Sequence, residues 1–108
     1  MSLIAVLAAA AMAASPVPQA RLADASCDRL AEGLTAFHQE TLRWEQRAVS
    51  LGGAPNPDVA AMTRRMQAVA RYMAARNLRP RAINEADGVL DRSTGTEMMT
   101  EFERRCRV

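Results

Sequence analysis

The stretch that decides the fold is Cys27–Leu51, which reads CDRLAEGLTAFHQETLRWEQRAVSL. A row of largely apolar residues recurs through it at alternating intervals of three and four positions. This row, called the seam below, consists of Cys27, Leu30, Leu34, Phe37, Thr41, Trp44, Ala48 and Leu51. Such spacing, sustained for about seven turns, predicts an amphipathic helix with one buried stripe, because a strand would alternate every second residue. Asp24 or Ser26 can cap its start.

The composition favours a single small α-helical domain. The chain has 108 residues, of which 49% are apolar and only 4% aromatic. Ala, Leu, Val and Met supply most of the apolar content, whereas aromatic and Ile side chains, which favour strands, are scarce. A chain of this length is one domain at most, and the all-α class fits this composition.

A second helix is predicted after a short connection. Two consecutive glycines and Pro55 end the first helix. Asn56 can then cap the second helix, with Pro57 at its first position. The buried stripe of this helix consists of Val59, Met62, Met66, Val69 and Met73. The helix is expected to fade within residues 77–80, and the short connection predicts an antiparallel hairpin.

The last thirty residues predict two shorter helices. Asn84–Arg92 can form the first, and a turn is expected at Ser93–Gly95. Thr94 and Glu97 have the spacing of a capping box, which would open the final helix.

The two cysteines, Cys27 and Cys106, are predicted to form a disulfide. Their separation is too long for a C-x-x-C redox pair, and two thiols alone make a poor zinc site. The bond would close a loop of about 80 residues and would stabilise the fold by roughly 4.5 kcal/mol in the chain-entropy model. The first predicted helix is roughly 37 Å long, whereas the Cα atoms of a disulfide lie within about 7 Å of each other. The chain must therefore run up and down an even number of times before Cys106 can reach Cys27. The predicted fold is therefore all-α, a small antiparallel helical bundle of two long and two short helices, closed by one disulfide.

Residues 1–20 are predicted to be a secretory signal peptide. Leu3–Ala14 is an apolar run of twelve residues, shorter than the roughly 20 that span a bilayer. Small residues suited to cleavage lie near positions 13 and 20, which leaves residues 21–108 as a single α-helical domain without a transmembrane span. No basic residue precedes the run, so an Ala-rich tail on a cytosolic protein with reduced thiols is the alternative. We expect a periplasmic or secreted protein.

Catalysis is not expected. The fourteen basic residues are all Arg, which excludes Schiff-base chemistry and a lysine general base. Nucleotide-binding glycine loops, zinc-protease signatures and nucleophile elbows do not occur in the sequence. The net charge of +2 is too small to argue for nucleic acid or a membrane on its own.

His38 is the only histidine and lies one position away from the seam. With Met66 or Met73 it forms a candidate haem or copper site, because a His–Met pair across a bundle can hold haem and Met-rich sites can hold copper. The alternative is that these methionines fill the core and His38 lies at its rim. The sequence favours this alternative, so no cofactor or metal is predicted.

Residues 64–81 contain six arginines and no acid, whereas residues 85–103 contain six acids and one arginine. The candidate partner-binding residues in the first segment are Arg64, Arg65, Arg71 and Arg76. They could meet an anionic surface, such as phospholipid, lipopolysaccharide or nucleic acid. The favoured interpretation is that the two segments lie side by side and neutralise each other. Tyr72 is the only aromatic residue in the basic segment, which leaves no stacking platform for nucleic acid.

Together these observations predict a small exported helical protein that binds an envelope protein or a second copy of itself, without catalysis. The methionines suit an adaptable binding groove. The first alternative is a haem- or copper-binding bundle that uses His38 and a Met. The second, which applies if the chain is not exported, is an Arg-rich nucleic-acid binder.

Overall fold

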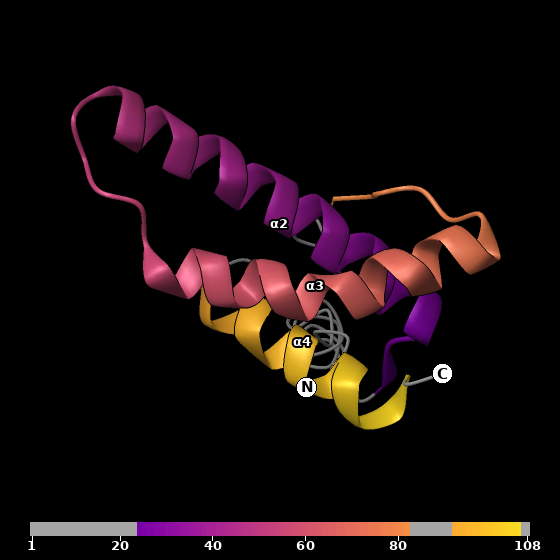
Figure 1. Cartoon of the computed structure of the whole chain (residues 1–108). Coiled ribbons are helices and arrows are strands. Elements are labelled where there is room, and N and C mark those ends of the chain that lie inside the picture. The colour runs from indigo at the N-terminus through magenta and orange to yellow at the C-terminus, as the bar shows by residue number, and fades with distance from the viewer. Residues whose placement is uncertain (1–23, 83–91, 107–108) are drawn as a thin grey trace, which may run out of the picture.

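The computed structural model of the protein describes residues 24–82 and 92–106, which form three helices (Figure 1). The helices are α2 (Cys27–Ser50), α3 (Pro57–Arg76) and α4 (Arg92–Arg105). No strand occurs in these two ranges, and the predicted all-α class is confirmed. The predicted signal peptide lies outside the described residues.

The helices α2 and α3 begin where a local side chain accepts from a free backbone amide, and they end in backbone hydrogen bonds. The Ser26 side chain accepts a hydrogen bond from the Arg29 amide at 3.0 Å and caps α2. Asn56 caps α3 by accepting from the Asp58 amide at 2.9 Å, and a proline occupies the first turn. Asn77 ends α3 in the left-handed conformation, with φ of 59°. These caps confirm the predicted starts of the first two helices. The last helix starts at Arg92, two residues before the predicted opening at Thr94.

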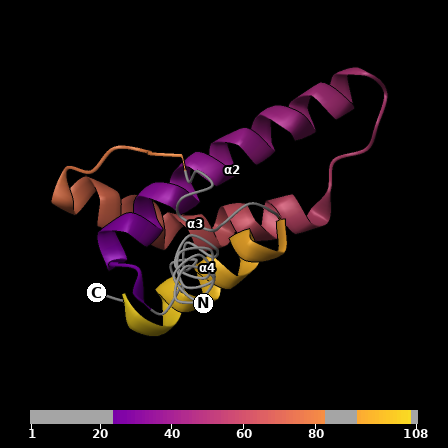
Figure 2. The same cartoon turned by 180° about the vertical axis from the view of Figure 1, so that it is seen from behind.

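The helices α2 and α3 form an antiparallel hairpin, and α4 packs against the first half of α2 (Figures 1 and 2). The second half of α2 diverges from α3 in both views. The core lies where all three helices meet. It consists of Leu30, Ala31, Leu34, Met66, Val69, Tyr72, Met73, Met98, Met99, Phe102 and Cys106.

A disulfide joins Cys27, the first residue of α2, to Cys106, just after α4, with 5.7 Å between their Cα atoms. After α3 the segment 77–82 runs back beside the first half of α2 (Figure 1). There the Arg81 amide donates to the Glu32 carbonyl at 3.2 Å, and the Arg29 guanidinium donates to the Arg81 carbonyl at 2.9 Å. The predicted disulfide is confirmed.

The predicted turn at Ser93–Gly95 is wrong, because these residues lie in the first turns of α4. Gly95 lies inside α4 and contributes to the packing of α4 against α2. A Cβ atom at this position would lie 2.5 Å from the Phe37 ring of α2, so glycine permits a close approach of the two helices. The expected helix Asn84–Arg92 lies outside the described residues except for Arg92, where α4 starts, so the structure shows three helices in its described part.

Candidate functional site

The seam of α2 is buried in its first half and exposed in its second. Leu30 and Leu34 are 2% and 1% exposed, whereas Trp44 is 57% and Leu51 82% exposed. The prediction of one buried stripe along the whole helix is therefore wrong from Trp44 onward. An apolar row that continues past the core leaves an apolar surface on the end of the helix.

The short length of α4 explains this change. At about 1.5 Å per residue, the 24 residues of α2 span about 36 Å and the 14 residues of α4 about 21 Å. The first turn of α4 lies against Phe37. From there α4 runs toward Cys106, which is bonded to Cys27 at the start of α2. Trp44 and Leu51, one and two heptads beyond Phe37, are left without the cover that α4 gives to Phe37.

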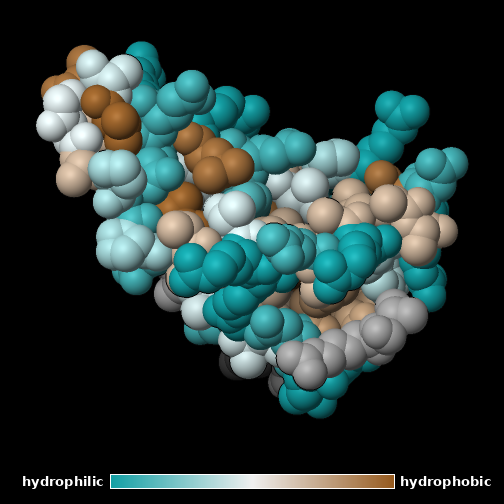
Figure 3. Space-filling view, viewed as in Figure 1, coloured by the Kyte–Doolittle hydropathy of each residue, from teal (hydrophilic) through white to brown (hydrophobic). Residues whose placement is uncertain are grey.

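A groove of about 540 Å³ opens between the second half of α2 and the start of α3. We call it the tip groove; its lining consists of Phe37, His38, Thr41, Trp44, Glu45, Ala48, Ala54, Asn56, Asp58, Val59, Met62 and Thr96. Figure 3 shows apolar side chains at the surface over this end of the molecule, at the upper left. The volume lies within the range of ligand-binding sites.

The polar groups of the tip groove are largely engaged within the chain. Glu45 accepts a hydrogen bond from the Asn56 amide at 2.9 Å, which ties the α2–α3 connection to α2. The Thr41 hydroxyl donates to the Phe37 carbonyl at 3.0 Å. These internal bonds leave the apolar side chains as the main surface that the groove offers to a partner.

His38 bridges α2 and α3 through its Nε2, which lies 2.9 Å from the Thr63 hydroxyl oxygen. Because that hydroxyl donates to the Val59 carbonyl at 2.9 Å, its oxygen accepts from Nε2, and the ring proton is assigned to Nε2. Burial lowers the pKa of His38 and favours the neutral ring.

The structure brings the candidate cofactor residues together in part. His38, Met66 and Met73 line one depression of about 500 Å³ on a face shared by α2 and α3. Both methionines are buried in the core, and the Nε2 of His38 is occupied by Thr63. This arrangement favours packing over ligation. Within residues 24–82 and 92–106, no three His, Cys, Asp or Glu side chains gather as metal ligands would.

The candidate partner-binding arginines separate into two groups. Arg65 donates through two nitrogens to the Glu103 carboxylate of α4, at 3.1 and 2.5 Å. Arg76 pairs with Asp28 of α2 at 3.2 Å. Arg64 and Arg71 are exposed and form no ion pair with the described acids. The favoured prediction, that the basic and acidic segments neutralise each other, thus holds for Arg65, which pairs with α4. Arg76 pairs instead with an acid of α2.

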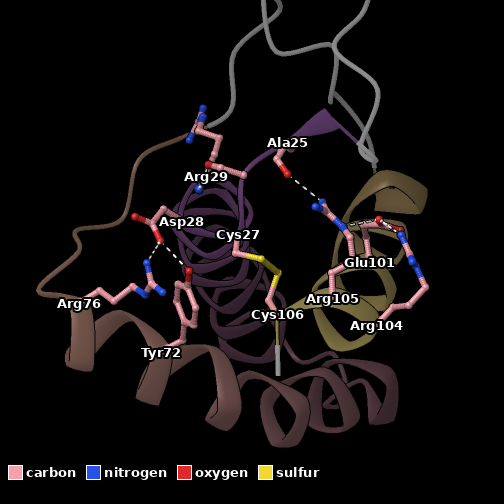
Figure 4. Close-up of a disulfide and its surroundings, with 11 residues drawn as sticks. Ala25, Cys27, Asp28, Arg29, Tyr72, Arg76, Glu101, Arg104, Arg105 and Cys106 are labelled. Carbon is pink, nitrogen blue, oxygen red and sulfur yellow. Dashed lines mark hydrogen bonds and ion pairs between the residues drawn. A yellow bond between two sulfur atoms is a disulfide. The ribbon is translucent and has the colours of Figure 1, made fainter. Parts of the chain in front are cut away.

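The contacts around the disulfide hold the ends of all three helices together (Figure 4). The Tyr72 hydroxyl of α3 donates to Asp28 of α2 at 2.6 Å, and burial together with this hydrogen bond raises the pKa of Tyr72. The Arg105 guanidinium of α4 donates to the Ala25 carbonyl at 2.8 Å. Figure 4 shows these residues on both sides of the Cys27–Cys106 bond. These contacts lie at the start of α2, here called the base, and the tip groove lies toward the other end of α2.

Comparison with known proteins adds no relative. No protein-family model, curated protein or solved structure matches the chain. None of the helices in the described ranges has the length and the apolar content to cross a membrane.

The tip groove is the feature that the sequence did not reveal. The continuous seam gave no sign that its second half would be exposed. One signal was present: the last predicted helix, starting at Thr94 and reaching Cys106, was about half as long as the first. A helix tied by Cys106 to the start of α2 cannot also cover the far end of α2.

Proposed function

We propose that this protein is exported, is closed by its disulfide, and acts without catalysis by binding the apolar face of a protein helix in the tip groove. The observation that carries the proposal is the exposure of Trp44, at 57%, beside the groove. Large aromatic side chains next to a groove are typical anchors of protein interfaces.

The shape of the groove favours a helix as the occupant. Its two walls are helices that diverge, with seam residues on α2 and with Val59 and Met62 on α3. The α2 wall of the groove runs from Phe37 to Ala48, about 16 Å or three turns. Amphipathic helices dock into such grooves through apolar residues at intervals of three, four and seven positions.

Export is supported by the disulfide and by the apolar run Leu3–Ala14. Disulfides persist mainly in oxidising compartments. Intact mass spectrometry of the native protein, by cell fraction and with and without reductant, tests this part. We expect a chain that lacks about the first 13 to 20 residues and gains two protons on reduction. A full-length, reduced chain in the cytosol would contradict export.

Binding is tested by NMR on the oxidised protein with a synthetic amphipathic peptide that repeats Leu in heptad spacing. We expect shifts at Trp44, Val59 and Met62 that saturate with added peptide. Trp44→Gln should weaken binding roughly 10-fold or more, since it removes the anchor. The matched control, Gln46→Ala, changes an exposed residue of the same helix outside the groove lining. A scrambled peptide of the same composition that gives equal shifts would refute the proposed function.

A further inference from the structure

The exposed flank of α2 has a repeat of seven residues. Phe37, Trp44 and Leu51 follow one another at this interval, and the first is covered by Gly95 of α4 while the other two are exposed. Residues seven apart lie on the same side of a helix, so the row continues straight out of the core. A helix packed along this row would extend the cover that α4 begins.

Two charged residues border the same row. Glu40 and Arg47 are also seven apart, and Trp44 lies between them in the sequence. Both are exposed, and the Arg47 guanidinium lies over the Trp44 ring, 5.8 Å from its centroid. Positions 40 and 47 precede positions 44 and 51 by four residues, so each lies beside the apolar row on the same flank.

This arrangement is complementary to itself. If two α2 helices pack antiparallel with a two-fold axis near Trp44, then Glu40 of one copy lies opposite Arg47 of the other. The same axis places Leu51 of each copy toward the Phe37 end of the other copy's groove. Two oppositely charged pairs then flank one apolar row. Arg43, which pairs with Glu40 at 3.8 Å within each chain, lies close to the same axis.

We infer that the occupant of the tip groove is a second copy of this chain, and that the protein forms a two-fold dimer through antiparallel pairing of the α2 ends. This inference rests on the proposed function, because it names the partner of the same groove. Closed two-fold dimers are the commonest symmetric assembly. The acids around the groove are Glu40, Glu45 and Asp58, and the nearby arginines are Arg43 and Arg47. Because the acids outnumber the arginines, an anionic membrane or nucleic acid is a poorer match than a second copy.

Sedimentation of the full oxidised protein, from about 1 µM to about 1 mM, tests the dimer. We expect a concentration-dependent change from monomer to dimer. Glu40→Arg should weaken the dimer about 10-fold or more, since it places arginines opposite each other twice, and Arg47→Glu should do the same with acids. The double variant Glu40→Arg/Arg47→Glu should restore the wild-type dissociation constant. The matched control is Gln46→Glu, which adds a charge on the outer side of the same helix.

A mixture of the two single variants gives the sharpest result. Glu40→Arg in one chain and Arg47→Glu in the other provide opposite charges at both pairs, so we expect a heterodimer where each variant alone is monomeric. A protein that stays monomeric to about 1 mM, or a double variant that fails to regain the dimer, overturns the inference. If the monomer still binds the heptad peptide at Trp44, only the dimer is refuted, and the groove serves a helix of another protein. If neither occurs, the proposed function is refuted as well.

Discussion

The split of the seam makes opposite predictions for the same substitution at Leu34, inside α2, and at Leu51, the residue just after α2. Leu34 is 1% exposed, and Leu34→Ala removes buried methyl groups and leaves a cavity, which costs about 3 to 4 kcal/mol of unfolding free energy. Leu51 is 82% exposed, so less than a fifth of its surface is buried. If full burial of a leucine is worth roughly 1.5–3 kcal/mol, Leu51→Ala should cost only about 0.3 to 0.5 kcal/mol.

Urea unfolding of the oxidised monomer, followed by far-UV circular dichroism at about 1 µM, measures both values under conditions where a weak dimer is dissociated. The m-values should equal that of the wild type, because neither change alters the surface exposed on unfolding by much. A loss above about 1.5 kcal/mol for Leu51→Ala would mean that the end of α2 belongs to the core. A loss below about 1 kcal/mol for Leu34→Ala would mean that the first half of the seam is not packed.

Three further predictions follow from the packing and the electrostatics. Replacing Cys27 and Cys106 together by Ser should lower the unfolding free energy by about 4.5 kcal/mol, because the bond joins residues 79 positions apart. Urea unfolding that shows a loss below about 1 kcal/mol would contradict this prediction. Gly95→Ala should lower the unfolding free energy by about 1 to 3 kcal/mol, although Ala favours helices, because its Cβ meets the Phe37 ring. In a Phe37→Leu background the same substitution should cost less. An equal loss in both backgrounds would refute the contact. Burial lowers the pKa of His38, so as pH falls the unfolded chain, with a His pKa near 6.5, binds a proton before the folded protein does. The unfolding free energy of the wild type should therefore drop between about pH 7 and pH 5, and that of His38→Gln should drop less. Equal pH slopes for the two proteins would be evidence against the lowered pKa.

Local features of the fold were predictable from the sequence because they depend on neighbouring residues. Ser26, Asn56 and Pro57 act at the helix starts as their types suggest, since a cap needs only an oxygen side chain next to free amides. The disulfide was also predictable, because only two cysteines exist and the pairing has one solution. The antiparallel relation of α2 and α3 followed from their short connection.

The failures concern contacts between distant segments. Gly95 was assigned to a turn between two predicted short helices, but it lies within α4 against the Phe37 ring, more than fifty residues earlier. Trp44 was expected to be buried because the period of its helix is uniform. A period reports which side of a helix is apolar, and it does not report how far a partner helix extends.

The two ends of α2 have different physical tasks, and the difference explains how a small domain can leave an apolar surface exposed. At its start, the disulfide, the Tyr72–Asp28 hydrogen bond and the Arg105–Ala25 contact join the helices. At its far end, the Glu45–Asn56 hydrogen bond ties the connection to the helix. Stability of the monomer is therefore concentrated at the base, and the exposed row can vary in its contacts without unfolding the core. A surface that the fold does not need for its own stability is free to serve a partner, and at this surface we propose that a second copy binds through Trp44, Glu40 and Arg47.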